Sequence, residues 1–132
     1  MLKKKANFTK SSEVDDIIAS IRTAALHSDS NFRNKLDLLE AEQFGLSVNH
    51  NQVVAFHAYD TAIASAVKAE FIHEQGLACE KAGFYSKRVR NTEKSLFYYK
   101  QARECYQKWG SSVKVLSVQR ELDNLSSPMV GD

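Results

Sequence analysis

Residues 55–62 read AFHAYDTA and residues 95–102 read SLFYYKQA, and the two stretches coincide when residue 55 is laid on residue 95. Each holds a small residue, a tyrosine four positions later and an alanine three positions after that (Ala55, Tyr59, Ala62; Ser95, Tyr99, Ala102). The same displacement, the repeat shift, places Glu40 on Glu80, Phe44 on Phe84 and Lys68 on Lys108. A fixed period of roughly 40 residues is typical of stacked helical hairpins, which bury their apolar faces only against one another. Such arrays are usually binding surfaces or spacers, so the period points away from catalysis.

Composition indicates one ordinary globular domain. The chain has 132 residues with 43% hydrophobic and 26% charged residues, and its net charge of +2 is too small to imply nucleic acid or membrane. Cys79 and Cys105 lie apart inside helical patterns, which favours reduced thiols in an intracellular protein over a disulfide. The basic start at residues 1–5 is not followed by an apolar segment, and no stretch is long enough to span a membrane. We therefore expect a cytoplasmic protein.

The patterns divide the chain into three parts. We expect a disordered basic N-terminus over residues 1–10, a helical domain over 11–125 and a disordered tail over 126–132. Ser12-x-x-Asp15 resembles a capping box and predicts a first helix that continues to about Leu26. A second helix starts near Asn31 and ends between residues 45 and 51.

Four further helices are predicted after residue 49. Asn49 or Asn51 is a candidate N-cap for the third helix, which meets the fourth near residues 68–72. The fourth runs from about residue 71 to residue 89, and the turn at residues 90–92 provides a cap for the fifth. Gly110 is a natural end for that helix, and Ser111 or Ser112 caps the sixth. The polar side of the sixth helix suits the end of an array.

Small residues mark the fourth helix and an aromatic seam marks the fifth. Gly76, Cys79 and Gly83 form one stripe, which predicts close approach of a partner helix, with a hinge as the alternative. On the fifth helix, small and aromatic residues recur at alternating intervals of four and three positions, which predicts one continuous buried seam. It holds Ser95, Tyr99, Ala102, Tyr106 and Trp109.

When the spacing of small residue, tyrosine and alanine is placed on the second helix of each hairpin, and Gly83 at the small position of the first, the pattern resembles tetratricopeptide repeats. The period exceeds the roughly 34 residues that are usual in that family, and the proline that normally closes each repeat is absent. A closer likeness covers about residues 31–125. It rests on LLEAE at 38–42, on FIHEQGLACE at 71–80, and on Ala102-x3-Tyr106-x2-Trp109-Gly110-x3-Lys114-Val115. These strings resemble the helical-repeat region that follows the predictive AAA-type ATPase module in multidomain serine/threonine or histidine kinase signalling proteins.

The resemblance implies an all-α fold of antiparallel hairpins stacked as a tetratricopeptide-like array, with a C-terminal capping helix. It also implies a non-enzymatic interaction or regulatory module, part of a larger ATPase or kinase polypeptide. No phosphate-binding glycine loop and no kinase signature occurs in the chain, so it is not expected to hydrolyse ATP. The expected partner is a protein or peptide segment or a neighbouring ATPase or kinase domain, without a cofactor or metal. Homodimerisation through an end helix is a further expectation.

If Gly76 opens the second hairpin, five side chains of the fourth helix face its groove: Leu77, Glu80, Phe84, Lys87 and Arg88. They are candidate partner-binding residues. Glu80 and Phe84 recur one period earlier as Glu40 and Phe44, and packing between successive hairpins is the alternative explanation for this recurrence. Under the binding hypothesis, replacing Phe84, Lys87 and Arg88 together weakens partner capture without lowering the melting temperature.

Two other functions fit parts of the sequence. Glu70-x-x-His73 has the spacing found in di-iron helical bundles, where a second such motif faces the first; here only His57-x-x-Asp60 offers a partner. The alternative to a metal site is that His57 and His73 are ordinary histidines on helix surfaces. Eight basic residues between residues 81 and 108, interleaved with aromatics, also resemble a single-stranded nucleic-acid surface. That reading requires the aromatic rings to be accessible, whereas the seam predicts that several of them are buried.

Overall fold

The computed structural model describes residues 13–19, 30–47 and 50–126, and within them it is all-helical, without a strand. The basic N-terminus, the Ser12 cap, the continuation of the first helix to Leu26, Asn49 as a cap and the tail beyond residue 126 lie outside the described residues. Ser126, which the sequence placed in the tail, is the last residue of a helix. No described helix has both the length and the apolar character to cross a bilayer.

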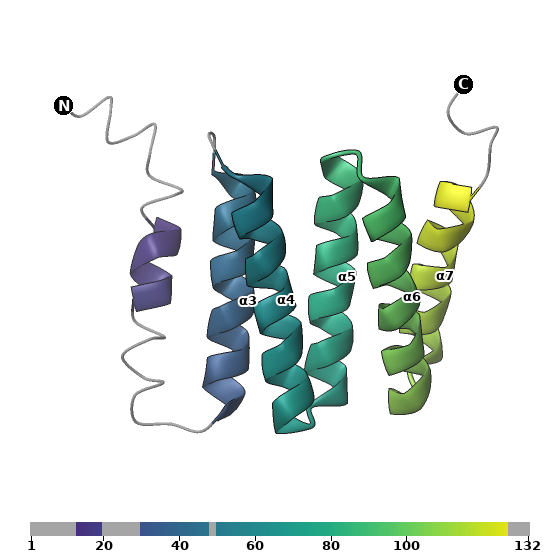
Figure 1. The fold of residues 1–132 in the computed structure, drawn as a ribbon. Coiled ribbons are helices and arrows are strands. Elements are labelled where there is room, and N and C mark those ends of the chain that lie inside the picture. Colours follow the sequence, from purple (N-terminus) through teal and green to yellow (C-terminus); the bar gives the residue numbers. More distant parts are fainter. Residues whose placement is uncertain (1–12, 20–29, 48–49, 127–132) are drawn as a thin grey trace.

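The helices lie side by side in chain order and alternate in direction (Figure 1). Residues 13–19 form a helical segment beside the first long helix. The long helices are α3 (Ser30–Leu46), α4 (Gln52–Ala69), α5 (Ile72–Arg88), α6 (Thr92–Trp109) and α7 (Ser112–Ser126). Each packs against the next in the sequence, and α3 also contacts α5.

The turns after α4, α5 and α6 share one geometry. Glu70, Arg90 and Gly110 each adopt a left-handed conformation, with φ of 62°, 65° and 93°. In each turn the next amide hydrogen-bonds back to a carbonyl five positions earlier: Phe71 to Ala66, Asn91 to Ser86 and Ser111 to Tyr106. This is the Schellman pattern, which satisfies the last carbonyls of a helix. The repeated turn therefore sets the even spacing of the starts of α4, α5, α6 and α7, at positions 52, 72, 92 and 112.

Side-chain caps begin α4, α6 and α7 at the predicted places. The Asn51 Oδ1 atom accepts from the Val53 amide at 2.8 Å, and the Asn91 Oδ1 atom accepts from the Lys94 amide at 3.1 Å. Ser111 caps α7 by accepting from the Lys114 amide at 3.3 Å. These contacts satisfy amides that have no partner within the helix.

The repeat shift relates α4 to α6 but does not relate α3 to α5. It lays both ends of α4 on the ends of α6, whereas α3 must be displaced two positions further to meet α5. The loop before α4 is longer than the turn before α6, which accounts for the difference. Glu40 and Glu80, or Phe44 and Phe84, therefore fall two positions apart on their helices. When α3 is laid on α5 from end to end, the buried Ala41 falls on Gly83. The repeat shift would instead lay Gln43 on Gly83.

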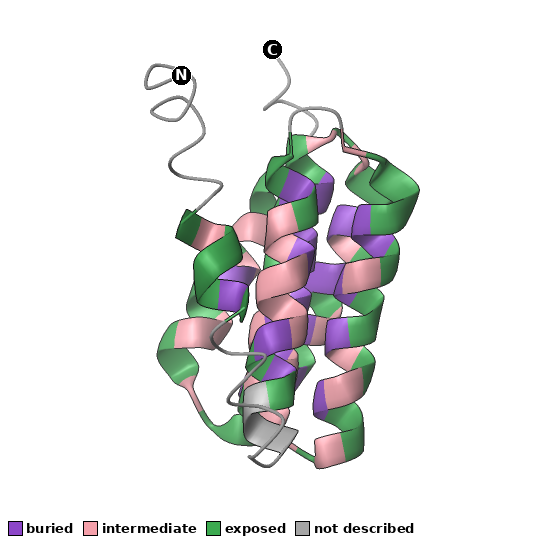
Figure 2. Cartoon of the chain, turned by 90° about the vertical axis from the view of Figure 1, so that its left-hand side faces the viewer, coloured by how far each residue is buried: buried purple, intermediate pink, exposed green. Residues whose placement is uncertain are grey.

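The core combines tyrosines with small residues. All five tyrosines are buried, and so are Ala55, Ala62, Ser95 and Ala102 of the two matching stretches. Buried positions lie on the sides of the helices that face one another (Figure 2). Tyr59 lies between α3, where its hydroxyl donates to Glu42, and α5, where its ring lies 5.4 Å from that of Tyr85. Tyr99 packs against Gly83 of α5 and belongs to a cluster with Val118 and Leu122 of α7.

Three glycines lie directly against tyrosine rings. A Cβ atom on Gly83 would lie 3.0 Å from three atoms of the Tyr99 ring, and one on Gly76 would lie 2.8 Å from the Tyr106 ring. Gly45 has the same relation to Tyr85, at 3.0 Å. Because α5 is continuous through both of its glycines, their role is close packing and not a hinge.

The seam on α6 is buried except at its end. Ser95, Tyr99, Ala102 and Tyr106 are buried as predicted, but Trp109 is 47% exposed. Its ring stacks on His73 of α5, with centroids 4.2 Å apart. The prediction was wrong at Trp109 because this residue ends the helix, beyond the part of α5 that carries the small stripe.

Replacing Gly83 with alanine tests the close approach. Alanine favours the helix by about 1 kcal/mol, but overpacking against the ring of Tyr99 costs about 1–3 kcal/mol. The ring atoms include Cγ, which cannot swing away, so we expect Gly83→Ala to lower the free energy of unfolding in urea. Tyr99→Leu in the same chain should recover part of the loss, and the exposed Lys81→Ala serves as control. Additive effects of the two substitutions would contradict the direct contact.

The buried tyrosines predict unfolding in alkali. Burial raises the pKa of all five tyrosines, and carboxylate hydrogen bonds raise those of Tyr59, Tyr98 and Tyr106 further. A raised pKa gives stability that is complete below the unfolded value of about 10 and is lost as the pH rises toward the folded value. We expect the free energy of unfolding to fall steeply above about pH 10. Tyrosinate absorbance should appear together with loss of helical circular dichroism; tyrosinate in a fully helical protein would be the opposite result.

Candidate protein-interaction surface on α5

The five predicted partner-binding residues all lie on α5, but they differ in exposure and in contacts. Leu77 and Glu80 are half-buried, while Phe84, Lys87 and Arg88 are exposed. Polar contacts join this helix to α3 on one side and to α7 on the other. These contacts decide which of the five side chains are available to a partner.

Glu80 is an internal acceptor. Its Oε1 atom accepts a hydrogen bond from the Tyr106 hydroxyl at 2.8 Å and lies 3.0 Å from the Lys114 ammonium of α7. The Lys114 ammonium also lies over the Tyr106 ring, 5.1 Å from its centroid. A buried hydroxyl needs such an acceptor, so this carboxylate serves the packing of α5, α6 and α7.

Lys87 and Arg88 bridge to opposite neighbours. The Lys87 ammonium forms an ion pair of 2.9 Å with Glu121 of α7. The Arg88 guanidinium donates to the Gly45 carbonyl at 2.8 Å, and its Cζ atom lies 5.3 Å from the centroid of the Tyr85 ring. Arg88 thus ties the end of α5 to the end of α3.

Phe84 differs from these neighbours because it is apolar and 55% exposed. Along α5 it follows the exposed Lys81 by one turn and Leu77 by two. On the α3 side of α5, Lys35 pairs with Glu74 at 2.9 Å, and on the α7 side the pairs of Glu80 and Lys87 form a second row. We call Leu77, Lys81 and Phe84 the α5 strip. Of the five predicted residues, only Leu77 and Phe84 remain in it; packing accounts for the other three.

The structure does not assemble the metal site that the sequence left open. Glu70 ends α4 in a left-handed turn, and His57 lies near the other end of the same helix, about 20 Å away. Asp60 accepts a hydrogen bond from the Tyr98 hydroxyl at 2.6 Å. Among residues 13–19, 30–47 and 50–126, no group of three His, Cys, Asp or Glu side chains is placed to hold a metal.

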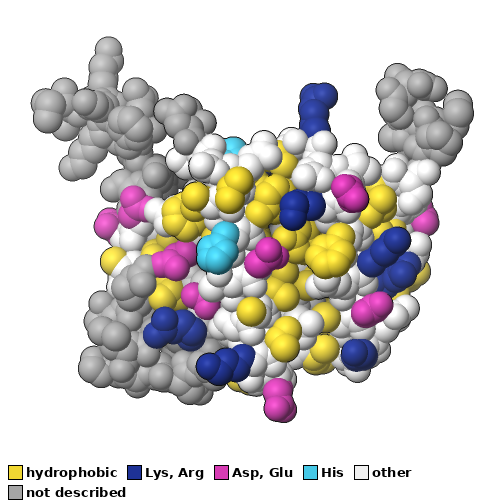
Figure 3. Space-filling model, in the orientation of Figure 1, with side chains coloured by type: hydrophobic (Ala, Val, Ile, Leu, Met, Phe, Trp, Pro, Cys, Tyr) yellow, Lys and Arg dark blue, Asp and Glu magenta, His cyan; other side chains and the backbone are white. Residues whose placement is uncertain are grey.

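Internal contacts engage part of the basic set. Four of the eight have internal contacts: Lys87 and Arg88 as described, Arg103 with Gln119 at 2.8 Å, and Lys94 over the Phe56 ring at 4.7 Å. Tyr85, Tyr98, Tyr99 and Tyr106, which the nucleic-acid hypothesis counts among its stacking platforms, are buried. Acidic side chains lie among the basic ones on the face turned to the viewer in Figure 3. These observations weigh against a single-stranded nucleic-acid site.

The two thiols are buried and protonated. Burial raises the pKa of Cys79 to about 12, and its thiol donates to the Gln101 amide oxygen at 3.6 Å. Burial also raises the pKa of Cys105. Because the thiolate is the nucleophilic form, this environment does not activate either cysteine at neutral pH.

Single substitutions should separate structural from available residues. Arg88→Ala removes a charged hydrogen bond to a carbonyl and a cation–π contact, so we expect it to lower the free energy of unfolding by about 1 kcal/mol. Phe84→Ala should change it by less than about 0.5 kcal/mol, because more than half of the side chain is already in water. Urea unfolding of both variants measures the difference. Equal losses would mean that Phe84 is part of the core, and that the α5 strip is no binding surface.

Comparisons with known proteins add no assignment to this surface. No protein-family model matches the chain, and neither a curated protein nor a solved structure matches it. The functional meaning of the α5 strip therefore depends on its own residues and contacts.

Proposed function

We propose that this protein is a non-enzymatic interaction or regulatory module of an intracellular signalling protein, built as a tetratricopeptide-like array. In this proposal α3 with α4 and α5 with α6 are successive hairpins. Support comes from the repeat shift that relates α4 to α6 and from the equivalent burial of Tyr59 and Tyr99. The contact between α3 and α5 is the one expected between first helices of neighbouring hairpins.

In the same proposal α7 is a capping helix. The repeat shift lays the start of α5 at Ile72 on the start of α7 at Ser112, so α7 stands where a third first helix would be. The positions that hold Gly76, Cys79 and Gly83 in α5 hold Leu116, Gln119 and Asp123 in α7. Leu116 and Asp123 are exposed. A face with these larger side chains does not suit close approach of another tyrosine-bearing helix.

The observation that carries the functional proposal is the exposed Phe84 on α5. An aromatic side chain that is not needed for packing, next to the exposed cation of Lys81, is the kind of residue that anchors a partner. Ion pairs to α3 and α7 line the strip on both sides, so its two apolar residues and Lys81 have a charged rim. The partner in this proposal is a protein or peptide segment that brings an apolar side chain to Phe84. The resemblance suggests that it belongs to an adjoining ATPase or kinase domain of a larger polypeptide.

Peptide selection tests the proposal with random sequences as the probe. Peptides displayed on phage are selected on the wild-type chain and then measured against Phe84→Ala. We expect the selected peptides to bind the variant at least about tenfold more weakly, because truncating a central aromatic anchor typically costs about 2 kcal/mol or more, and about 1.4 kcal/mol is a factor of ten. Phe97→Ala is the matched control, since Phe97 is 57% exposed but lies on α6. Peptides that bind Phe84→Ala as well as wild type, or that depend on Phe97, would refute the assignment of the α5 strip.

A further inference from the structure

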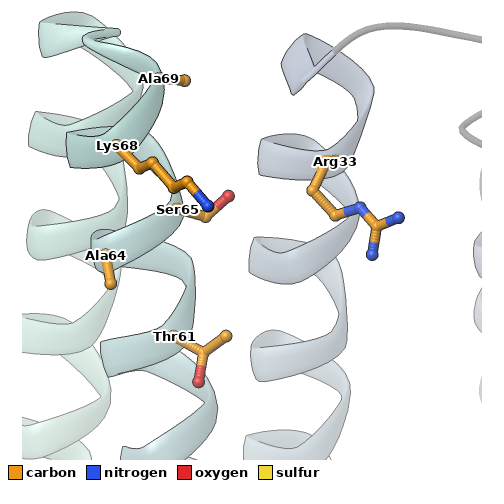
Figure 4. Close-up of a pocket in the computed structure, with 6 residues that line it drawn as sticks. All are labelled: Arg33, Thr61, Ala64, Ser65, Lys68 and Ala69. Atoms are coloured by element: carbon orange, nitrogen blue, oxygen red, sulfur yellow. The ribbon is translucent and has the colours of Figure 1, made fainter.

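A depression between α3 and α4 has an unusual lining. It lies where α3 begins and α4 ends, and it has a volume of about 610 Å³ (Figure 4). The described residues that line it are Arg33 of α3 and Thr61, Ala64, Ser65, Lys68 and Ala69 of α4. Two are cations, two carry hydroxyls, and among them there is no carboxylate. The lining therefore favours an anion.

Neither cation of the lining is paired within the described part of the chain. Lys35, Lys87 and Lys114 each form an ion pair of 2.9 or 3.0 Å, whereas Arg33 and Lys68 form none with the described residues. Lys68 extends from α4 toward α3, while the exposed guanidinium of Arg33 points away from α4 and can turn by side-chain rotation (Figure 4). The positive dipole end of α3 and the negative dipole end of α4 both lie at this place, so the attraction for an anion comes from the two cations.

A buried amide beside the depression has an unmet donor. Asn34 is only 3% exposed, and its Oδ1 atom accepts a hydrogen bond from the Ser65 hydroxyl. Its Nδ2 atom is buried and has no hydrogen-bond partner among the described residues. A buried donor without an acceptor is costly, and it is rarer than an unpaired carbonyl oxygen.

A half-turn of the Asn34 amide exchanges the unmet donor for an unpaired carbonyl oxygen, which is the less rare situation in protein interiors. Nδ2 then donates to the Ser65 oxygen, and the Ser65 hydroxyl proton is released from Asn34. An acceptor in the depression can take that proton. Binding of an anion next to Ser65 and pairing of the Asn34 donor are therefore mutually favourable.

We propose that this depression binds a phosphate group, held between Arg33 and Lys68 and hydrogen-bonded by Ser65. Two cations match the charge of a phosphomonoester dianion, and a guanidinium and an ammonium are the usual donors to its oxygens. Free phosphate and a phosphorylated side chain share this chemistry. Because the second pKa of a phosphomonoester is about 6, affinity should fall below about pH 6 as the dianion is protonated.

Titration with inorganic phosphate and with O-phosphoserine tests the proposal, followed by proton–nitrogen correlation NMR spectra at constant ionic strength. We expect saturable shifts at the Asn34 side-chain amide and the Ser65 backbone amide. The double variant R33A/K68A should raise the dissociation constant by at least about fivefold, since two charge-assisted contacts are lost. The matched control K100A/K108A removes the same charge from exposed positions of α6 and should bind like wild type. A common melting temperature for the three proteins shows that folding is not the cause of a difference.

The remaining outcomes are equally decisive. Tighter binding of O-phosphoserine identifies a phosphorylated segment as the source, and equal binding identifies free phosphate; both support the phosphate site. Acetate that shifts Asn34 as strongly as phosphate would overturn the assignment, as would the absence of saturation or equal binding by R33A/K68A. The depression is formed by α3 and α4 and not by the α5 strip, so this experiment and the Phe84 test can fail independently.

Discussion

The close approach of glycine backbones to tyrosine rings is the constraint on which the rest of the structure depends. Gly76 and Gly83 of α5 receive Tyr106 and Tyr99 of α6, and Gly45 of α3 receives Tyr85 of α5. A ring that occupies the space of a missing side chain joins two helices at short distance. The small residues of the matching stretches are buried with these rings, so large aromatic and very small side chains make up most of the core.

Tyrosines bring hydroxyl groups into this core, and each hydroxyl that is buried needs a partner. Tyr59, Tyr98 and Tyr106 donate to Glu42, Asp60 and Glu80, and the Tyr85 hydroxyl lies 2.8 Å from the His50 ring nitrogen. Tyr85 and Tyr106 also pack on glycines, whereas the hydroxyls of Tyr59 and Tyr98 link α4 to α3 and to α6. The hydroxyl contacts therefore add links between helices that the glycine contacts do not make. This network has a consequence for function, because carboxylates used as acceptors are not available to a ligand. The sequence offered Asp60 as a candidate metal ligand and Glu80 as a candidate partner-binding residue. Both carboxylates instead accept hydrogen bonds from buried tyrosines.

Sequence patterns identified some turns and missed the nature of others. Gly110, Asn91 and Asn51 have residue types that favour a left-handed turn or an N-cap, and they lie at the predicted helix boundaries. Glu70 and Arg90 take the same left-handed conformation without being glycine, because the backbone hydrogen bonds of the turn hold them there. Propensity gives no sign of this at Glu70, and the sequence predicted only that the two helices meet near residues 68–72.

By itself, the sequence determined the all-helical fold, the burial of most of the α6 seam, the small stripe on α5 and most of the caps. These features depend on spacing within one helix or on residues adjacent in the chain, and periodicity records both. Only the tertiary structure decided that the displacement from α3 to α5 is two positions larger than that from α4 to α6, that Trp109 is exposed, and that Lys87 and Arg88 contact opposite neighbours. It alone brought Arg33 and Asn34 of α3 beside Ser65 and Lys68 of α4. The physical reason is that loop length and helix packing set which side chains of different helices meet, and neither leaves a periodic trace in the chain.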